Sequence, residues 1–187
     1  MRRSNMIARK LVVLTVLVSV MATFLGPLSP AQAAHRKPPR AVFKSPGAWQ
    51  RGVLGTHCWS YVDRGEDEGV GYCADAMHDF PEAEPAGAGD AAIFRLWAPK
   101  RPSELAIEYW RELDQDGQPV GNSQTIEAEL QPYRRNGELV AFDAMFELPA
   151  GNGDHYLWLF AKWERFRRPH GRAEGDASYD FHLDLSN

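Results

Sequence analysis

Residues 156–163 read YLWLFAKW and residues 179–185 read YDFHLDL, and these two stretches decide the fold class. In the second stretch apolar and polar residues alternate strictly, which is the pattern of a strand with one face in a core. The first stretch is almost continuously apolar, which predicts a central strand buried on both faces. Both stretches therefore predict extended structure in the last third of the chain.

Short segments of the same kind occur through most of the preceding sequence. Extended structure is predicted for residues 49–62, 70–74, 91–97, 105–109, 139–148 and, more weakly, 124–130. Turns rich in Gly, Pro, Asp and Asn separate these segments, which predicts an all-β fold, an immunoglobulin-like or fibronectin-like antiparallel β-sandwich of about eight strands. Residues 148–151, LPAG, followed by Tyr156 are similar to the corner of such sandwiches in which a Tyr hydroxyl ties a connecting loop to the core.

One segment fits two interpretations. Ser103 and the residues after it could cap and start a helix that runs to Leu113. Leu105, Ile107 and Tyr109 instead alternate as in a strand. Because the following DQDGQP has the composition of a hairpin turn, we predict a strand.

The first 33 residues have the pattern of a secretory signal. A basic start precedes an apolar run over residues 11–26, and residues 31–33 read AQA, an A-x-A cleavage site. A membrane anchor is the alternative, but the run is shorter than the roughly 20 residues of a helical span and Pro27 closes it. We predict cleavage after Ala33 and no membrane span in the mature chain, while the Arg2-Arg3 pair leaves twin-arginine export open.

The composition fits one globular domain behind this signal. The chain has 187 residues, 44% hydrophobic and 25% charged, which excludes collagen-like, coiled-coil and wholly disordered classes. Residues 1–33 hold four of the 21 basic residues and none of the 25 acidic ones, so the mature chain has a net charge of −8 and is not expected to bind nucleic acid. Residues 34–48, basic and rich in Pro, predict a flexible arm, and residues 49–187 the β-sandwich domain.

Cys58 and Cys73 flank a Gly- and acid-rich stretch that suits a turn. A hairpin in which the two cysteines face each other also pairs Trp59 with Tyr72 and places the turn on residues 63–69. Because export leads to an oxidising environment, we predict a structural disulfide that stabilises the fold by about 3 kcal/mol. A redox or metal role is the alternative, and the absence of a CxxC spacing disfavours it.

The same register places Trp59 and Tyr72 on the hairpin face opposite the sulfur atoms. If this face points inward, its aromatic residues belong to the core. If it points outward, they form a platform that could stack on sugars or other flat ligands. We favour the core, because buried aromatic residues are the commoner case.

The hairpin also carries a family resemblance. Residues 55–59, GTHCW, and residues 71–75, GYCAD, resemble the opening of a group of uncharacterised secreted bacterial β-sandwich proteins. The likeness extends over nearly all of the mature chain, including a DGQPVG-like turn and the final G-D-A-S-Y-x-F strand of residues 175–181. The resemblance implies a secreted or envelope-attached β domain and implies no activity.

No motif for a nucleophile elbow, a zinc protease, a P-loop or a dinucleotide fold occurs. We therefore predict no catalytic residue, metal or cofactor, with a small secreted hydrolase whose site is assembled from distant loops as the alternative. Three further groups have suitable residue types but no pattern that predicts a site. They are the metal-like group Asp75, His78, Asp79 and Glu82, the carboxylates Glu104, Glu108 and Glu112, and the separate histidines His57, His155 and His182.

Charge is unevenly distributed. Residues 65–94 hold eight acidic residues and no Lys or Arg, whereas residues 162–172 are rich in Arg. We interpret the two as solvated loops of opposite sign that face each other. The partner, if any, is predicted to be an anionic envelope polymer or an extracellular protein. The expected contacts are Arg165, Arg167 and Arg168, and after them Trp59 and Tyr72. An enzyme should instead show a pocket in which a His or carboxylate has a hydrogen-bonding partner.

Overall fold

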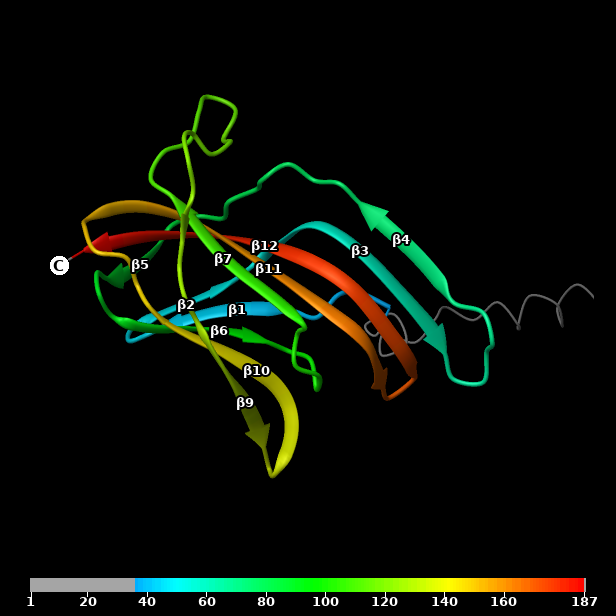
Figure 1. Cartoon of the computed structure of the whole chain (residues 1–187). Helices are drawn as coiled ribbons and strands as arrows, with labels where there is room; N and C mark the ends of the chain where they lie inside the picture. Colours follow the sequence, from blue (N-terminus) through cyan, green and yellow to red (C-terminus); the bar gives the residue numbers. More distant parts are fainter. Residues whose placement is uncertain (1–35, 187) are drawn as a thin grey trace, which may run out of the picture. The chain divides into compact units, whose positions relative to one another are not determined.

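The computed structural model describes residues 36–186, and within these residues every helix or strand assigned is a β-strand (Figure 1). Twelve strands form a five-stranded and a seven-stranded sheet, which pack face to face as an open β-sandwich. The predicted all-β sandwich is therefore confirmed. The predicted signal peptide of residues 1–33 lies outside the described residues.

The five-stranded sheet is antiparallel throughout. Its strands, in spatial order, are β2 (Ala48–Arg51), β1 (Ala41–Ser45), β6 (Ala91–Leu96), β10 (Glu138–Glu147) and β9 (Glu129–Arg135). In β6 the buried residues Ala92, Phe94 and Leu96 follow the period of two that a strand with one face in the core requires.

The seven-stranded sheet contains the longest strands. Its strands, in spatial order, are β4 (Val70–Ala74), β3 (Val53–Asp63), β12 (Gly171–Ser186), β11 (Gly153–Arg168), β7 (Glu104–Trp110) and β8 (Gln124–Thr125). The short strand β5 (Glu84–Gly87) pairs in parallel with the end of β12. Strands β11 and β12 form the central hairpin, and they contain both stretches from which the fold class was predicted.

The core lies between the two sheets. Phe43 and Phe94 from the five-stranded sheet and Leu157, Leu159 and Phe181 from the seven-stranded sheet are fully buried. The ring centroids of Phe94 and Phe181 lie 4.6 Å apart, so the two inner faces are in direct contact. Burial of one such side chain contributes about 1.5–3 kcal/mol, which makes this interface the main source of stability.

Strand β11 is buried on one face rather than on both, so that prediction is wrong. Leu157 and Leu159 face the core, whereas Trp158 and its outward neighbours Tyr156 and Phe160 are only half-buried. The reason is that the connection from β4 to β5 partly covers the outer face. Phe80 from this connection packs against Tyr156 with ring centroids 5.2 Å apart.

The predicted flexible arm over residues 34–48 is wrong for the described part. Residues 41–45 form β1, which lies between β2 and β6, and Phe43 is fully buried. The Tyr179 hydroxyl donates a hydrogen bond to the Pro39 carbonyl, and burial raises the pKa of Tyr179. The domain therefore begins before residue 49. The many Pro and basic residues of this segment favoured the arm prediction, although the segment contains a strand whose charged side chain faces outward.

The strand count differs from the expected eight for four reasons. Residues 41–45 add β1 and residues 84–87 add β5, and the strands expected over 49–62 and 124–130 are each divided into two. The segment that fitted either a helix or a strand is strand β7, as predicted. The Tyr156 hydroxyl does not form the expected corner contact, because its ring stacks on His182 at the outer face.

Candidate functional site

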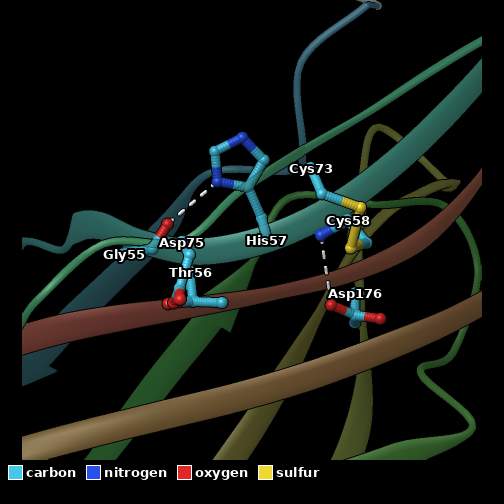
Figure 2. The surroundings of a disulfide bond; sticks show 7 residues. All are labelled: Gly55, Thr56, His57, Cys58, Cys73, Asp75 and Asp176. Atoms are coloured by element: carbon cyan, nitrogen blue, oxygen red, sulfur yellow. Dashed lines mark hydrogen bonds between the residues drawn. A yellow bond between two sulfur atoms is a disulfide. The ribbon is translucent and has the colours of Figure 1, made fainter.

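The hairpin of β3 and β4 has the predicted register and disulfide. Cys58 pairs with Cys73 and Trp59 with Tyr72, and the sulfur atoms of the two cysteines are bonded. Figure 2 shows the disulfide beside Asp176 of β12, whose carboxylate accepts a hydrogen bond from the Cys58 amide at 3.2 Å. A disulfide of this kind fits an oxidising, extracytoplasmic environment.

The two aromatic residues predicted as a second contact separate in the structure. Trp59 is 1% exposed and packs against Trp163 and Phe166, so it belongs to the core and cannot contact a partner. Tyr72 lies on the edge strand β4, is 36% exposed, and its hydroxyl donates to the Arg36 carbonyl at 3.0 Å. The two residues therefore do not form a common platform. They lie on the same face of the hairpin, but this face is buried at β3 and exposed to solvent at the edge strand β4.

The predicted Arg contact lies in the hairpin of β11 and β12 rather than in a loop. Arg165 pairs with Glu174 across the hairpin, with Nε 3.2 Å from Oε2. Arg168 donates to the Lys37 carbonyl at 2.9 Å and lies 5.8 Å from the Trp59 ring, and burial lowers its pKa. Arg167 is exposed. Two of the three arginines are thus already engaged by the fold.

Only the start of the acidic stretch lies beside the Arg-rich hairpin, so the expectation that the two charged segments face each other is confirmed in part, and Glu84 lies beside Trp49 instead. A shallow hollow of about 280 Å³ is lined by Glu66 from the acidic stretch together with Arg167, Arg168 and Arg172. The Arg64 amide donates to the His170 carbonyl at 2.8 Å, which holds the two turns together. The positive charge of the hairpin is therefore partly neutralised by its own neighbours.

A different basic region lies on the outer face of the five-stranded sheet. A groove of about 410 Å³ is lined by Arg40, Val42, Lys44, Trp49, Arg51 and Trp97. The alternation of β1 and β2 places Val42, Lys44, Trp49 and Arg51 on the outer face, and the register sets Lys44 opposite Trp49 and Val42 opposite Arg51. Arg40 precedes β1, and Trp97 follows β6. Trp49 is 55% exposed, so its ring is open to solvent.

Among the residues that the structure describes, the cations of this groove have no ion-pair partner. Within residues 36–186, no ion pair is formed by Arg40, Lys44 or Arg51. The nearby carboxylate of Glu84 accepts a weak hydrogen bond of 3.4 Å from the Trp49 amide. The groove thus combines unneutralised positive charge with an exposed aromatic ring.

Arg95 on the same sheet face shows the opposite case. Its guanidinium donates to both Asp143 oxygens at 2.7 and 2.8 Å, and it lies 3.3 Å from the Tyr133 ring centroid. The hydrogen bond to Asp143 raises the pKa of Arg95. This arginine is fixed as part of the sheet surface and is not free to bind a partner.

Sequence reasoning missed the groove because residues 34–48 were interpreted as an arm. The signal was present: Arg40, Val42 and Lys44 alternate with the small or aromatic residues Ala41 and Phe43, the period of two of a strand. The sequence pattern does not predict that this strand pairs with β2, and it is this pairing that brings Trp49 and Arg51 into the groove.

Another hollow, smaller than the groove, lies on the outer face of the seven-stranded sheet. It encloses about 300 Å³ over Trp158 and Phe160 of β11, with Asp176 and Asp180 of β12 and His78 at its sides. Asp180 is 1% exposed; its carboxylate contacts Nδ1 of His78 at 2.9 Å and accepts from the Asp79 amide at 2.9 Å. From the sequence, His78 is a candidate only as a metal ligand.

His57, His155 and His182 each contact a backbone carbonyl through Nδ1. His182 lies with Nε2 2.9 Å from Asp154 and Nδ1 3.1 Å from the Pro81 carbonyl. His155 is fully buried, with Nδ1 2.9 Å from the Gly153 carbonyl, and burial lowers its pKa. Among the described residues, no group of three or more His, Cys, Asp or Glu side chains is arranged to hold a metal ion.

Comparisons with known proteins add no family. No family model, no curated protein and no solved structure matches the chain. Within the described residues there is no helix of the length and apolar character that crosses a membrane.

Proposed function

We propose that the chain is exported, that residues 1–33 are its signal peptide, and that the sandwich is a non-enzymatic domain that binds an anionic polymer of the cell envelope. The groove on the five-stranded sheet is the proposed binding site. The disulfide Cys58–Cys73 supports the location, since such bonds persist in oxidising compartments.

One observation carries the proposal: the cations Arg40, Lys44 and Arg51 surround the exposed ring of Trp49 and have no partner among the described residues. Two are placed by strands β1 and β2 and the third just precedes β1, so the positive charge is spread along the strand direction. A row of charges beside a flat ring suits an extended chain of acidic sugar units better than a single small ion.

The overall charge limits the expected affinity. Residues 34–187 carry a net charge of −8, so the rest of the surface repels a polyanion. Binding must therefore depend on short-range contacts in the groove, and we expect it to be modest. Salt screens such contacts, because the Debye length falls from about 30 Å at 0.01 M to about 8 Å at 0.15 M ionic strength.

The test is equilibrium binding of the full chain to polygalacturonate, with neutral dextran and a single-stranded oligonucleotide as comparison ligands. The triple variant Arg40→Ala/Lys44→Ala/Arg51→Ala should lose affinity roughly 3- to 100-fold, since each exposed ion pair contributes about 0.2–1 kcal/mol. Trp49→Ala should weaken binding without changing its salt dependence.

The matched control is Arg165→Ala/Arg167→Ala/Arg172→Ala, which removes the same charge from the hairpin end and should have little effect. An equal loss in both triple variants would show that only net charge matters and would refute the groove. Tighter binding of the oligonucleotide than of polygalacturonate would indicate a nucleic-acid site instead.

A hydrolase is the second candidate, and the contact between His78 and buried Asp180 favours it, because a carboxylate that orients a histidine is a common catalytic arrangement. The neighbouring Ser178 directs its hydroxyl to the Thr56 carbonyl at 3.1 Å, so its proton is used elsewhere. Hydrolysis of ester or glycoside substrates that is lost in His78→Ala would establish the enzyme and contradict the non-enzymatic proposal.

The type of sandwich and its relatives also belong to the proposal. We infer an immunoglobulin-like or fibronectin-like sandwich related to the secreted bacterial group whose opening hairpin the chain resembles. The support is the agreement of the GTHCW and GYCAD segments with a disulfide-bonded hairpin in the structure. A solved structure of a member of that group with a different strand order would contradict the relationship.

A further inference from the structure

We propose that the hollow on the outer face of the seven-stranded sheet is a separate binding site for a neutral sugar ring. It lies on the sheet opposite the basic groove and shares no residue with it. The proposal therefore does not depend on polyanion binding. Its volume of about 300 Å³ is at the lower end of the range of roughly 300–1,000 Å³ for small-molecule sites.

The floor of the hollow is aromatic. Trp158 and Phe160 are neighbours on the outward side of β11, with ring centroids 5.7 Å apart and planes inclined by 23°. Both rings remain partly exposed although they lie on a central strand of the sheet. Two nearly parallel rings give a flat apolar surface, which suits the C–H face of a pyranose.

The sides of the hollow are polar, and two of their atoms remain available. Asp180 orients the His78 ring through Nδ1, which leaves Nε2 without a hydrogen bond within the described residues. The Asp176 carboxylate uses Oδ1 for the Cys58 amide, which leaves Oδ2 for another donor. A sugar hydroxyl can donate to the carboxylate and also pair with the imidazole, so both side chains can be satisfied by one ring.

The charge of the hollow selects against anionic ligands. Two carboxylates line it and no Lys or Arg does. The adjacent Lys162, which lies opposite Asp176 in the register, directs its ammonium to Glu104 at 3.4 Å. A neutral ring avoids repulsion by Asp176 and is therefore favoured over an acidic sugar.

The disulfide positions one side of this hollow. The bond between Cys58 and Cys73 fixes the end of β4, from which the chain continues to His78. The Thr56 hydroxyl lies 3.2 Å from an Asp75 carboxylate oxygen and accepts from the Ala76 amide at 3.1 Å. Figure 2 shows Thr56 and Asp75 close together beside the disulfide. Reduction should therefore loosen the segment that carries His78.

The experiment is a titration of the full chain with chitotriose, cellotriose and trigalacturonate, followed by tryptophan fluorescence and by NMR shifts of indole N–H groups. We expect saturable binding of at least one neutral trisaccharide with a shift of the Trp158 indole signal, whereas trigalacturonate should leave that signal unchanged. Trp158→Ala should abolish it or weaken it at least tenfold, and the matched control Trp49→Ala should leave it unchanged.

Asp176→Asn is the second variant and guards against misfolding of Trp158→Ala, because asparagine keeps the acceptor for the Cys58 amide. It should weaken binding of the neutral sugar several-fold. If neither neutral trisaccharide binds, or if Trp49→Ala alone weakens binding, the site is refuted. Because the basic groove is probed separately with polygalacturonate, either site can fail without the other.

Discussion

The domain has two regions in which basic residues gather, and they differ in what those residues contact. At the hairpin end of β11 and β12, Arg165 pairs with Glu174 and Arg168 donates to the Lys37 carbonyl. In the groove on the five-stranded sheet, Arg40 and Arg51 have no partner among the described residues. Arg167 and Arg172 at the hairpin end have no ion pair among the described residues either, so the difference is that part of the richer cluster is already engaged by the fold.

The difference shows that the density of Arg in a sequence does not measure the positive charge that a partner can use. A cation that the fold has paired has already lost part of its hydration and is held in one geometry. A cation without a partner keeps its charge available, and the cost of fixing its side chain arises only on binding. The predictions below test this distinction, from the largest effect to the smallest.

Loss of the disulfide should have the largest effect and should spare the groove. The double variant Cys58→Ser/Cys73→Ser removes the cross-link of a hairpin beside the Arg-rich end, so the free energy of unfolding should fall by about 2–5 kcal/mol. Urea unfolding measures this loss. Polygalacturonate affinity, measured under conditions in which the variant is still folded, should stay unchanged. A fall in affinity would show that binding depends on the seven-stranded sheet rather than on the groove.

Arg95→Ala should be strongly destabilising although Arg95 lies on the same sheet face as the groove. Its removal leaves Asp143, which is 15% exposed, without the guanidinium that binds both of its oxygens. A loss of about 2–3 kcal/mol is expected, less than for a fully buried pair. Arg51→Ala is the control and should stay within about 0.5 kcal/mol of the natural chain. Similar values for the two would remove the distinction between paired and unpaired cations.

Arg168→Ala and Arg167→Ala should differ although the residues are neighbours. Arg168 packs over Trp59 and satisfies the Lys37 carbonyl, so its loss should cost about 1–2 kcal/mol. Arg167 is exposed, and its loss should cost less than about 0.5 kcal/mol. Thermal unfolding of both variants at equal ionic strength gives the comparison, and equal midpoints would contradict the structural role of Arg168.

The smallest expected effect concerns pH. Burial lowers the pKa of His155, so below about pH 6.5 the unfolded chain binds a proton that the folded chain does not. Stability should therefore fall as the pH drops below that value. His155→Asn, which retains a donor for the Gly153 carbonyl, should show a flatter dependence in urea unfolding at pH 7.5 and 5.5. Parallel curves for the two chains would exclude His155 as the cause.

The sequence predicted the fold well where a local pattern determines the structure. The alternation in residues 179–185 and the pairing of Cys58 with Cys73 both depend on a period of two, and both are confirmed. The arm prediction failed because Pro and basic residues outweighed the short alternation around Phe43. Burial on both faces of β11 failed because sequence cannot show whether a second layer covers the outer face.

The candidate sites were harder to predict because both depend on contacts between distant segments. Lys44 lies opposite Trp49 across a hairpin, but Trp97 follows the more distant strand β6. Asp180 lies 102 residues from His78 in the sequence. The acidic and Arg-rich segments could be recognised as opposite in charge. Which individual arginines were already paired could be decided only from the structure.

The central claim is that available charge, rather than total charge, determines binding. The most direct measurement is the ratio of polygalacturonate affinities for the two triple variants, Arg40→Ala/Lys44→Ala/Arg51→Ala and Arg165→Ala/Arg167→Ala/Arg172→Ala, at the same ionic strength. The account predicts that the first binds at least about threefold more weakly than the second, which should resemble the natural chain. Equal affinities, or a larger loss in the second variant, would contradict it.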